Sequence, residues 1–258
     1  MLEGRRAEGR GTLRLKHMRI LERGAAGRAG RTRHGASELG SAHRAISELI
    51  VAGQLRPGEP VRVERLAARL GLAPAPVREA LARLVDEGLI VELPGGEARV
   101  VELDERYVRD VFLVRSGLEG LCVELATPRI APDDLAGLVA MLERTGAALA
   151  RGDPEAYGRA DAALHRLVTA AADNRILLAE LCALQPHVDL IRTYTQRGQG
   201  THLPASHGEH LAIVAALQRR DAAAARQCME RHIRAAGERT LRLLARTAGP
   251  AAWRRATL

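Results

Sequence analysis

The sequence predicts a mainly α-helical protein in two folded parts, an N-terminal unit of three helices with a β-hairpin (36–102) and a C-terminal all-helical domain (103–248). The chain has 258 residues, 47% of them hydrophobic, which is enough for two modest cores. Aromatic residues make up only 2%, so Leu, Ala and Val must fill these cores, and that composition favours packed helices over a β-sandwich. Apolar residues also recur at helical spacing through most of the chain after Ala36.

Both ends of the chain are predicted to be tails. Residues 1–35 hold ten Lys or Arg against three Glu and are rich in Gly, so we expect a disordered basic tail there, and a second tail at 249–258. The net charge of +8 favours a polyanionic partner, although much of the excess lies in the first tail.

Neither a membrane segment nor a disulfide framework is indicated. No run of about 18 apolar residues is present, and the basic N-terminus lacks the apolar stretch of a secretory signal. The three cysteines are far apart and form no CxxC pair, which argues against disulfides and thiolate zinc fingers. We therefore expect a cytoplasmic protein with no membrane partner.

The N-terminal unit has the order of elements of a winged helix-turn-helix. Helices are predicted over 40–53, 64–70 and 75–87, followed by two β-like runs around Pro94-Gly95-Gly96. In this motif the second helix of the pair enters the major groove of double-stranded DNA. The predicted reading helix opens at Ala75-Pro76, and proline is tolerated in the first turn of a helix.

Candidate DNA contacts gather on this helix and the hairpin. Arg78 lies near the start of the helix and could bond bidentately to guanine N7 and O6, although it could instead be a surface ion-pair partner. Gly95 and Gly96 at the hairpin tip would allow the backbone to approach DNA closely. Further candidates, more suited to phosphates than to bases, are Arg65, Arg69 and Arg83.

The C-terminal domain is predicted to consist of helices alone. Breaks at Pro and Gly positions separate six periodic segments, and Pro186 could kink the fourth of them. The predicted helices span 104–127, 132–151, 154–171, 174–195, 205–219 and 222–246.

Four residues of this domain form a candidate metal site. Asp161 and His165 are four residues apart and share a helix face. His210 and His232 lie at similar distances on either side of the break at Arg220-Asp221, so an antiparallel fold at the break would bring them level. Three imidazoles and a carboxylate suit a divalent Zn, Ni, Mn or Fe ion. Nine histidines are present, and His187 and His207 are alternatives.

The N-terminal unit resembles the GntR-type DNA-binding domain. The similarity runs over GQLRPGEPVRVERLAARLGLAPAPVREALARLVDEGLIVELPGGEARV and includes GxLxPGE, LAxxLG and PVREALxRL. It implies that a homodimer binds a palindromic operator and that Arg78 contacts bases. Pro74 and Ala75 replace the Arg and Thr usual in the family, and Val63 and Arg65 replace two acidic residues, so the operator sequence is not implied.

The helical domain resembles the FCD domain of the FadR-type members of this superfamily. The matching segments are RSGLEGLCVELA, DAALHRLVTAAADN and EHLAIVAALQRRDAAAARQCMERHI. The resemblance places the family's metal ligands on Asp161, His165, His210 and His232, and implies a small carboxylate effector near the metal. Candidate effector contacts are Arg115, Asn174, Arg192 and Tyr194. Arg115 could equally pair with Glu119, and Asn174 could cap a helix.

Together these features predict a ligand-responsive transcriptional repressor that is not an enzyme. Two alternatives use the same cluster. A metal-dependent enzyme would need an additional general base, and no motif such as HExxH supplies one. A DNA-binding protein with a purely structural metal is the other.

Overall fold

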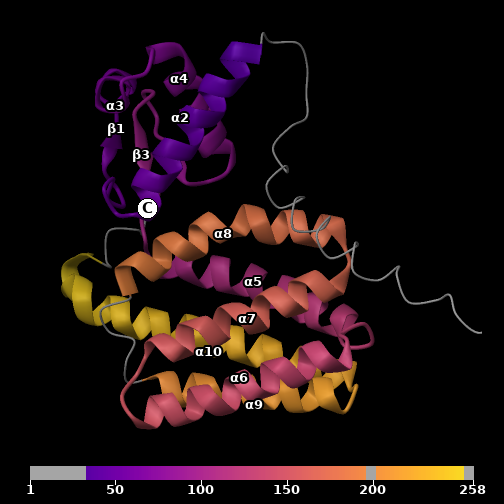
Figure 1. Ribbon diagram of the computed structural model, residues 1–258. Helices are drawn as coiled ribbons and strands as arrows, with labels where there is room; N and C mark the ends of the chain where they lie inside the picture. The colour runs from indigo at the N-terminus through magenta and orange to yellow at the C-terminus, as the bar shows by residue number, and fades with distance from the viewer. Residues whose placement is uncertain (1–32, 196–201, 253–258) are drawn as a thin grey trace, which may run out of the picture. The chain divides into compact units, whose positions relative to one another are not determined.

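The computed structural model describes residues 33–195 and 202–252, with side chains over 38–195 and 202–246. Its N-terminal part contains three helices and a three-stranded sheet, drawn in indigo and purple in Figure 1. These elements are α2 (Arg33–Val51), β1 (Pro60–Val61), α3 (Val63–Leu70), α4 (Pro74–Asp86), β2 (Ile90–Glu92) and β3 (Ala98–Val100). The predicted winged helix-turn-helix layout is thus present.

The sheet of this unit is antiparallel, with strand order β1-β3-β2 and Val91 opposite Arg99. The hairpin turn has Gly95 and Gly96 at φ of 102° and 80°, a backbone region that favours glycine. Apolar side chains of the helices and the hairpin form one core. Its fully buried members include Ile46, Ile50, Leu84, Leu89 and Ile90.

Several predicted boundaries of this unit were wrong. Helix α2 begins at Arg33, so the last residues of the predicted N-terminal tail are helical; residues 1–32 lie outside the described part. Helix α4 begins at Pro74, one residue earlier than predicted, and Ala73 is its N-cap without a side-chain hydrogen bond. Pro74 and Pro76 both lie in the first turn, where no backbone N–H has a partner within the helix. Strand β1 was not predicted.

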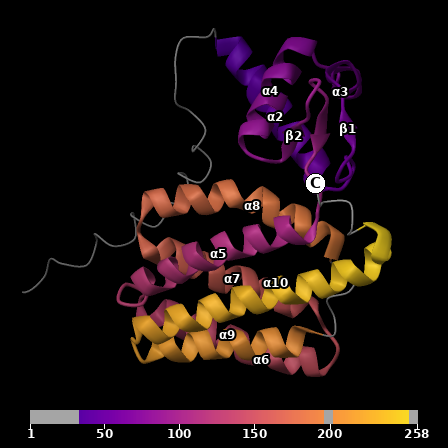
Figure 2. The same cartoon turned by 180° about the vertical axis from the view of Figure 1, so that it is seen from behind.

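The C-terminal domain consists of six helices over its described residues, as predicted. They are α5 (Glu105–Ala126), α6 (Pro132–Ala150), α7 (Glu155–Ala172), α8 (Arg175–Thr195), α9 (Leu203–Gln218) and α10 (Ala222–Ala252). Pro186 lies inside α8, and α10 runs past the predicted end at 246 into the predicted C-terminal tail. Figures 1 and 2 show α5, α7 and α10 between α8 on one side and α6 and α9 on the other.

Two glycines allow α5 and α10 to approach closely. A Cβ atom on Gly120 would lie 2.8 Å from Cγ of Glu230, and one on Gly237 would lie 3.0 Å from Cβ of Phe112. Around this contact the helices bury a core of aliphatic side chains. Its fully buried members include Leu142, Leu164, Ile213, Leu217 and Met229. The polar residues on the inner faces of α5, α7, α9 and α10 are thereby brought together. Among the described helices, none has the length and apolar character needed to cross a bilayer.

Candidate functional site

The structure brings the four predicted metal-site residues into one cluster. Asp161 and His165 come from α7, His210 from α9 and His232 from α10, and one candidate ligand atom from each lies within 4.8 Å of all the others. Oδ1 of Asp161 is 3.5 Å from Nε2 of His165 and 3.3 Å from Nε2 of His210. Nε2 of His210 is also 3.3 Å from Nε2 of His232. His210 is completely buried.

This geometry fits a divalent metal ion. In a tetrahedral site with bonds of about 2.0–2.1 Å, neighbouring ligand atoms lie about 3.3–3.4 Å apart, close to the separations found here. Nε2 of His165 is buried and has no hydrogen-bond partner among the described residues. Its ring therefore offers an unused nitrogen toward the centre of the cluster. The residues present could hold a metal ion with three nitrogens and one oxygen.

Two glutamates, of which Glu119 is buried and Glu209 is half-buried, fix the orientation of two of the histidines. Oε2 of Glu119 contacts Nδ1 of His165, and Oε2 of Glu209 lies 2.8 Å from Nδ1 of His232. A carboxylate only accepts hydrogen bonds, so each Nδ1 carries the proton and each Nε2 can present a lone pair to a metal. In contrast, Nδ1 of His210 is buried without a partner in the described part of the chain.

An arginine binds the far side of each glutamate. Nε of Arg115 donates to Oε1 of Glu119 at 2.6 Å, and Arg239 donates to both oxygens of Glu209 at 2.7 and 2.9 Å. Burial alone would raise the pKa of Glu119, but Arg115 and His165 outweigh it and lower this pKa to about 2. The pKa of Glu209 is likewise about 2, because bonds from His232 and Arg239 outweigh burial. Both glutamates are therefore ionised near neutral pH.

The pKa values of the clustered residues are shifted in different directions. Burial, helped by His210 and His165, lowers the pKa of His232 to about 4, so this ring is neutral near pH 7, as a metal ligand must be. Burial opposes ionisation of Asp161, but its close contacts with His165 and His210 hold its pKa well below the ordinary value. For His165, Glu119 and Asp161 outweigh burial and raise the pKa to about 9. A metal would therefore displace a proton from His165.

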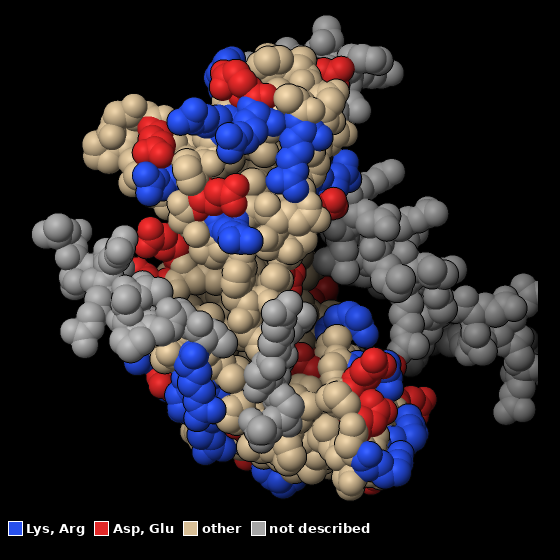
Figure 3. Space-filling model, turned by 90° about the vertical axis from the view of Figure 1, so that its left-hand side faces the viewer, with Lys and Arg blue, Asp and Glu red and all other residues tan. Residues whose placement is uncertain are grey.

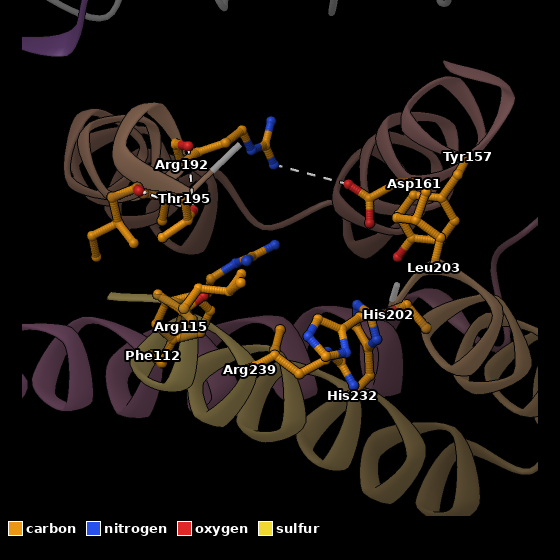
Figure 4. Close-up of a pocket in the computed structure, with 16 residues that line it drawn as sticks. Phe112, Arg115, Tyr157, Asp161, Arg192, Thr195, His202, Leu203, His232 and Arg239 are labelled. Carbon is orange, nitrogen blue, oxygen red and sulfur yellow. Dashed lines mark hydrogen bonds and ion pairs between the residues drawn. The ribbon is translucent and has the colours of Figure 1, made fainter. Parts of the chain in front are cut away.

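A cavity of about 120 Å³ adjoins the cluster. Asp161 and His232 belong both to the cluster and to the cavity wall, and Figure 4 shows Arg115, Arg192 and Arg239 around the same space. Arg192 makes a long ion pair with Asp161, at 3.9 Å. The Tyr157 ring stacks on His210 with centroids 5.2 Å apart.

The structure separates the four predicted effector contacts into two pairs. Arg115 and Arg192 line the cavity, whereas Asn174 and Tyr194 are not among its lining residues. Oδ1 of Asn174 accepts from the backbone N–H groups of residues 176 and 177, both at 3.1 Å, and so caps α8. The hydroxyl oxygen of Tyr194 lies 3.2 Å from the position of a Cβ on Gly53.

The two alternative histidines lie outside the cluster. Nδ1 of His187 is 2.6 Å from the hydroxyl of Tyr107, and Nε2 of His207 lies 3.0 Å from the position of a Cβ on Gly146. Sequence reasoning missed the cavity residues Tyr157 and Arg239. Spacing could have found both, because Tyr157 precedes Asp161 by one helical turn and Arg239 follows His232 by two.

The candidate DNA contacts on α3 and α4 are mostly exposed. Ala75, Arg78 and Arg83 are exposed on α4, and Pro76 is half-buried. No hydrogen bond or ion pair of the Arg78 guanidinium is found within the described residues, and its side chain is exposed, as contact with a base would require. Figure 3 shows basic side chains gathered on the N-terminal unit, with acidic ones beside them.

The remaining predicted DNA contacts differ in how they are held: Arg69 is bonded to a neighbour, whereas Arg65 and the two hairpin glycines are exposed. Arg69 on α3 donates to Oε1 of Gln54 at 2.8 Å, so its guanidinium is already held by the turn after α2. Arg65, on the same helix, is exposed, as are Gly95 and Gly96 at the hairpin tip. A Cβ on either glycine would meet nothing within 4 Å. The tip thus has room to approach a phosphate backbone.

Both parts of the chain match known families. Residues 40–100 match the family described as bacterial regulatory proteins, gntR family, and residues 110–235 match the FCD domain. The chain is 30% identical over 187 residues to the HTH-type transcriptional regulator McbR of Escherichia coli (strain K12), covering 69% of this chain and 80% of McbR. It is 28% identical over 203 residues to the HTH-type transcriptional repressor GlaR of the same organism, covering 74% of this chain and 90% of GlaR.

Solved structures agree with this fold. That of E. coli McbR/YncC has a TM-score of 0.60 and 24% identity, and the match covers 80% of this chain and 97% of the other. A GntR regulator from Rhodococcus sp. RHA1 has a TM-score of 0.58 and 19% identity, with coverages of 80% and 98%. The matched families and relatives are transcriptional regulators, not enzymes. This chain therefore belongs to the GntR family of DNA-binding transcriptional regulators and carries an FCD domain.

Proposed function

We propose that the chain is a cytoplasmic repressor that senses a small carboxylate at a divalent metal in its FCD domain. One observation carries this proposal: Asp161 and His232 belong both to the four-residue cluster and to the wall of the cavity. A ligand in the cavity would therefore lie beside the metal. Both domains would be needed, one to bind the ligand and one to bind the operator.

The metal would be held by Nε2 of His165, His210 and His232 and by a carboxylate oxygen of Asp161. Zn, Ni, Mn and Fe ions all accept such a donor set. When bound, the ion would supply positive charge that attracts an anionic ligand to the adjoining cavity. The chain contributes the rest: Glu119 and Glu209 orient two rings, and the surrounding aliphatic core limits the access of water.

The cavity favours a compact, negatively charged effector. Its volume of about 120 Å³ is well below the roughly 300–1,000 Å³ of pockets for drug-sized ligands. Arg192 is the cavity arginine best placed to receive a carboxylate, because its 3.9 Å pair with Asp161 is long, whereas Arg115 and Arg239 are closely bonded to glutamates. Arginine and carboxylate form strong charge-assisted bonds.

Helix α8 could carry the effector signal to the DNA-binding domain. Ile191, Arg192 and Thr195 line the cavity. On the same helix, Oγ1 of Thr193 donates to the carbonyl oxygen of Val51 in α2 at 2.7 Å, and Leu190 is part of the N-terminal core. A ligand that shifts α8 would therefore bias the placement of α2, by as much as its affinities for the two states differ.

A homodimer would bind the operator. A palindromic site is read by two copies of one helix-turn-helix. Repression as the outcome is supported by the relatives GlaR and RspR, which are described as transcriptional repressors. An exposed face of α5 suits contact with a second copy, because Leu113, Val114 and Leu121 are 65%, 51% and 37% exposed on it. A Leu113→Glu variant that stays dimeric in sedimentation analysis would remove α5 from the interface.

A mobility-shift series tests the proposed function. The full chain is titrated onto the DNA upstream of its own coding region, before and after chelation, after re-metallation, and with small mono- and dicarboxylates. We expect one carboxylate to weaken binding only when metal is present. A carboxylate effect that survives chelation would contradict metal-dependent sensing. Global unfolding on chelation, with no ligand effect, would assign the metal a purely structural role.

A further inference from the structure

Two series of bonded side chains, each made of an arginine, a glutamate and a histidine, lead from the cavity wall to the candidate metal-binding cluster. In the first, Arg115 binds Glu119, which binds His165. In the second, Arg239 binds Glu209, which binds His232. Both arginines line the cavity (Figure 4), and both histidines point Nε2 into the cluster. The same polar sequence of groups thus occurs twice, built from different helices.

We propose that Glu119 and Glu209 are positioning residues that couple occupancy of the cavity by an anion to the affinity of the cluster for its metal. This inference rests on the proposed function. An anion held by Arg192 in the cavity would also attract the guanidinium groups of Arg115 and Arg239, which line the same cavity, and so weaken their bonds to Glu119 and Glu209. Each glutamate would then interact more strongly with its histidine N–H, which makes Nε2 a better electron donor to the metal.

Burial makes this coupling effective. The side chain of Glu119 is 8% exposed and that of Arg115 is 14% exposed, so water cannot readily replace either partner. In the second series, the side chain of Arg239 is 12% exposed and that of Glu209 is 25% exposed. Electrostatic interactions between such groups are screened less than those on the surface. By linkage, the metal must strengthen anion binding by the same factor.

The two arginine–glutamate–histidine series include two of the three clustered histidines and leave out the third. Nδ1 of His210 has no carboxylate among the described residues, and its ring instead stacks on Tyr157. The coupling therefore acts through His165 and His232 and bypasses His210. Loss of one arginine–glutamate–histidine series should reduce the linkage between anion binding and metal affinity, and loss of both should abolish it.

Zinc titration of four variants tests this inference. Zn²⁺ affinity is measured by competition with a chromophoric chelator in the full chain, with and without succinate, for Glu119→Gln and Glu209→Gln. Glu124→Gln and Glu238→Gln are controls, because these carboxylates pair with Arg226 and Arg109 and contact none of the clustered histidines. We expect each test variant to lose about 10–100-fold in Zn²⁺ affinity, and the controls to lose none.

The decisive quantity is the ratio of Zn²⁺ affinities with and without succinate. We expect the ratio to exceed one in the parent and to fall toward one in each test variant. An unchanged ratio in both, or unchanged Zn²⁺ affinity, would overturn the inference. If Glu119→Gln unfolds, the more exposed Glu209 decides alone. A parent that binds no divalent metal would instead refute the proposed function, so the two failures are distinguishable.

Discussion

The two domains present their functional side chains in opposite ways. On the DNA-binding unit, Arg65, Arg78 and Arg83 are exposed. The guanidinium group of Arg78 has no hydrogen-bond or ion-pair partner among the described residues. In the FCD domain the polar groups of the cluster are buried or half-buried, and most are held by a defined neighbour, as Glu209 is by His232 and Arg239. A site whose side chains are already bonded to one another is organised in advance of a ligand, whereas exposed arginines without such partners are not.

The comparison predicts that the largest single effect will come from the buried cluster. His210→Ala removes a fully buried side chain that we propose as a metal ligand, so Zn²⁺ affinity should fall by more than the roughly 10–100-fold seen for changes in groups that only support a ligand. Chelator competition measures this. His207→Ala is a matched control on the same helix, because His207 lies outside the cluster. Equal losses in both variants would contradict the assignment of the cluster.

The next effect belongs to the exposed domain and should leave metal binding unchanged. Arg78→Ala should lower operator affinity by about 1–3 kcal/mol, with the loss concentrated at one base position, if the guanidinium reads a base edge. Arg83→Ala should instead weaken all sequences alike and reduce the salt dependence. Fluorescence anisotropy over a set of operator variants separates the two patterns. An Arg78→Ala protein with the affinity and selectivity of the parent would show that α4 reads DNA differently.

A third change tests whether Arg192 is the effector's cation. Loss of a charge-assisted bond is worth about 1.5–3 kcal/mol, so Arg192→Ala should lower carboxylate affinity by about 10–100-fold while Zn²⁺ affinity stays within a few-fold of the parent. Calorimetric titration of the metal-loaded protein measures both. Arg175→Ala, at the exposed start of the same helix, is the control. A larger loss in the control than in Arg192→Ala would move the carboxylate elsewhere.

The smallest predicted effect concerns the link between the domains. Thr193→Val keeps the shape of the side chain but removes the hydrogen bond to Val51, which is worth about 0.5–1.5 kcal/mol. The ratio of operator affinities with and without effector should therefore shrink, while metal and effector affinities are kept. If the ratio is unchanged, α8 transmits the signal through packing alone.

Local spacing was sufficient to predict some features and not others. Helical periodicity predicted the winged helix-turn-helix, and spacing paired Asp161 with His165 and His210 with His232. The resemblance to the FCD domain was needed to join these pairs and to set aside His187 and His207, and the structure brings the four together. The cavity was harder to predict, because its shape depends on how closely α5 and α10 pack at Gly120 and Gly237, a contact between distant segments.

Residue type and residue order were poor guides to the partner of a polar side chain. Asn174 has the residue type of a ligand contact, but its side chain is used to cap α8, since Asn bonds readily to nearby backbone N–H groups. Glu209 was overlooked because it adjoins His210 in sequence, yet it serves His232 on the next helix. Which histidine a carboxylate contacts is set by helix rotation, and residue order does not reveal that rotation.

Native mass spectrometry of the full chain, purified without chelators, tests the central claim most directly. It reports the metal and any bound acid in the same measurement. The account predicts a species carrying about one divalent ion per chain, with a small acid that is lost when the metal is removed. A chain that carries neither, and that still binds no Zn, Ni, Mn or Fe ion after incubation, would contradict it.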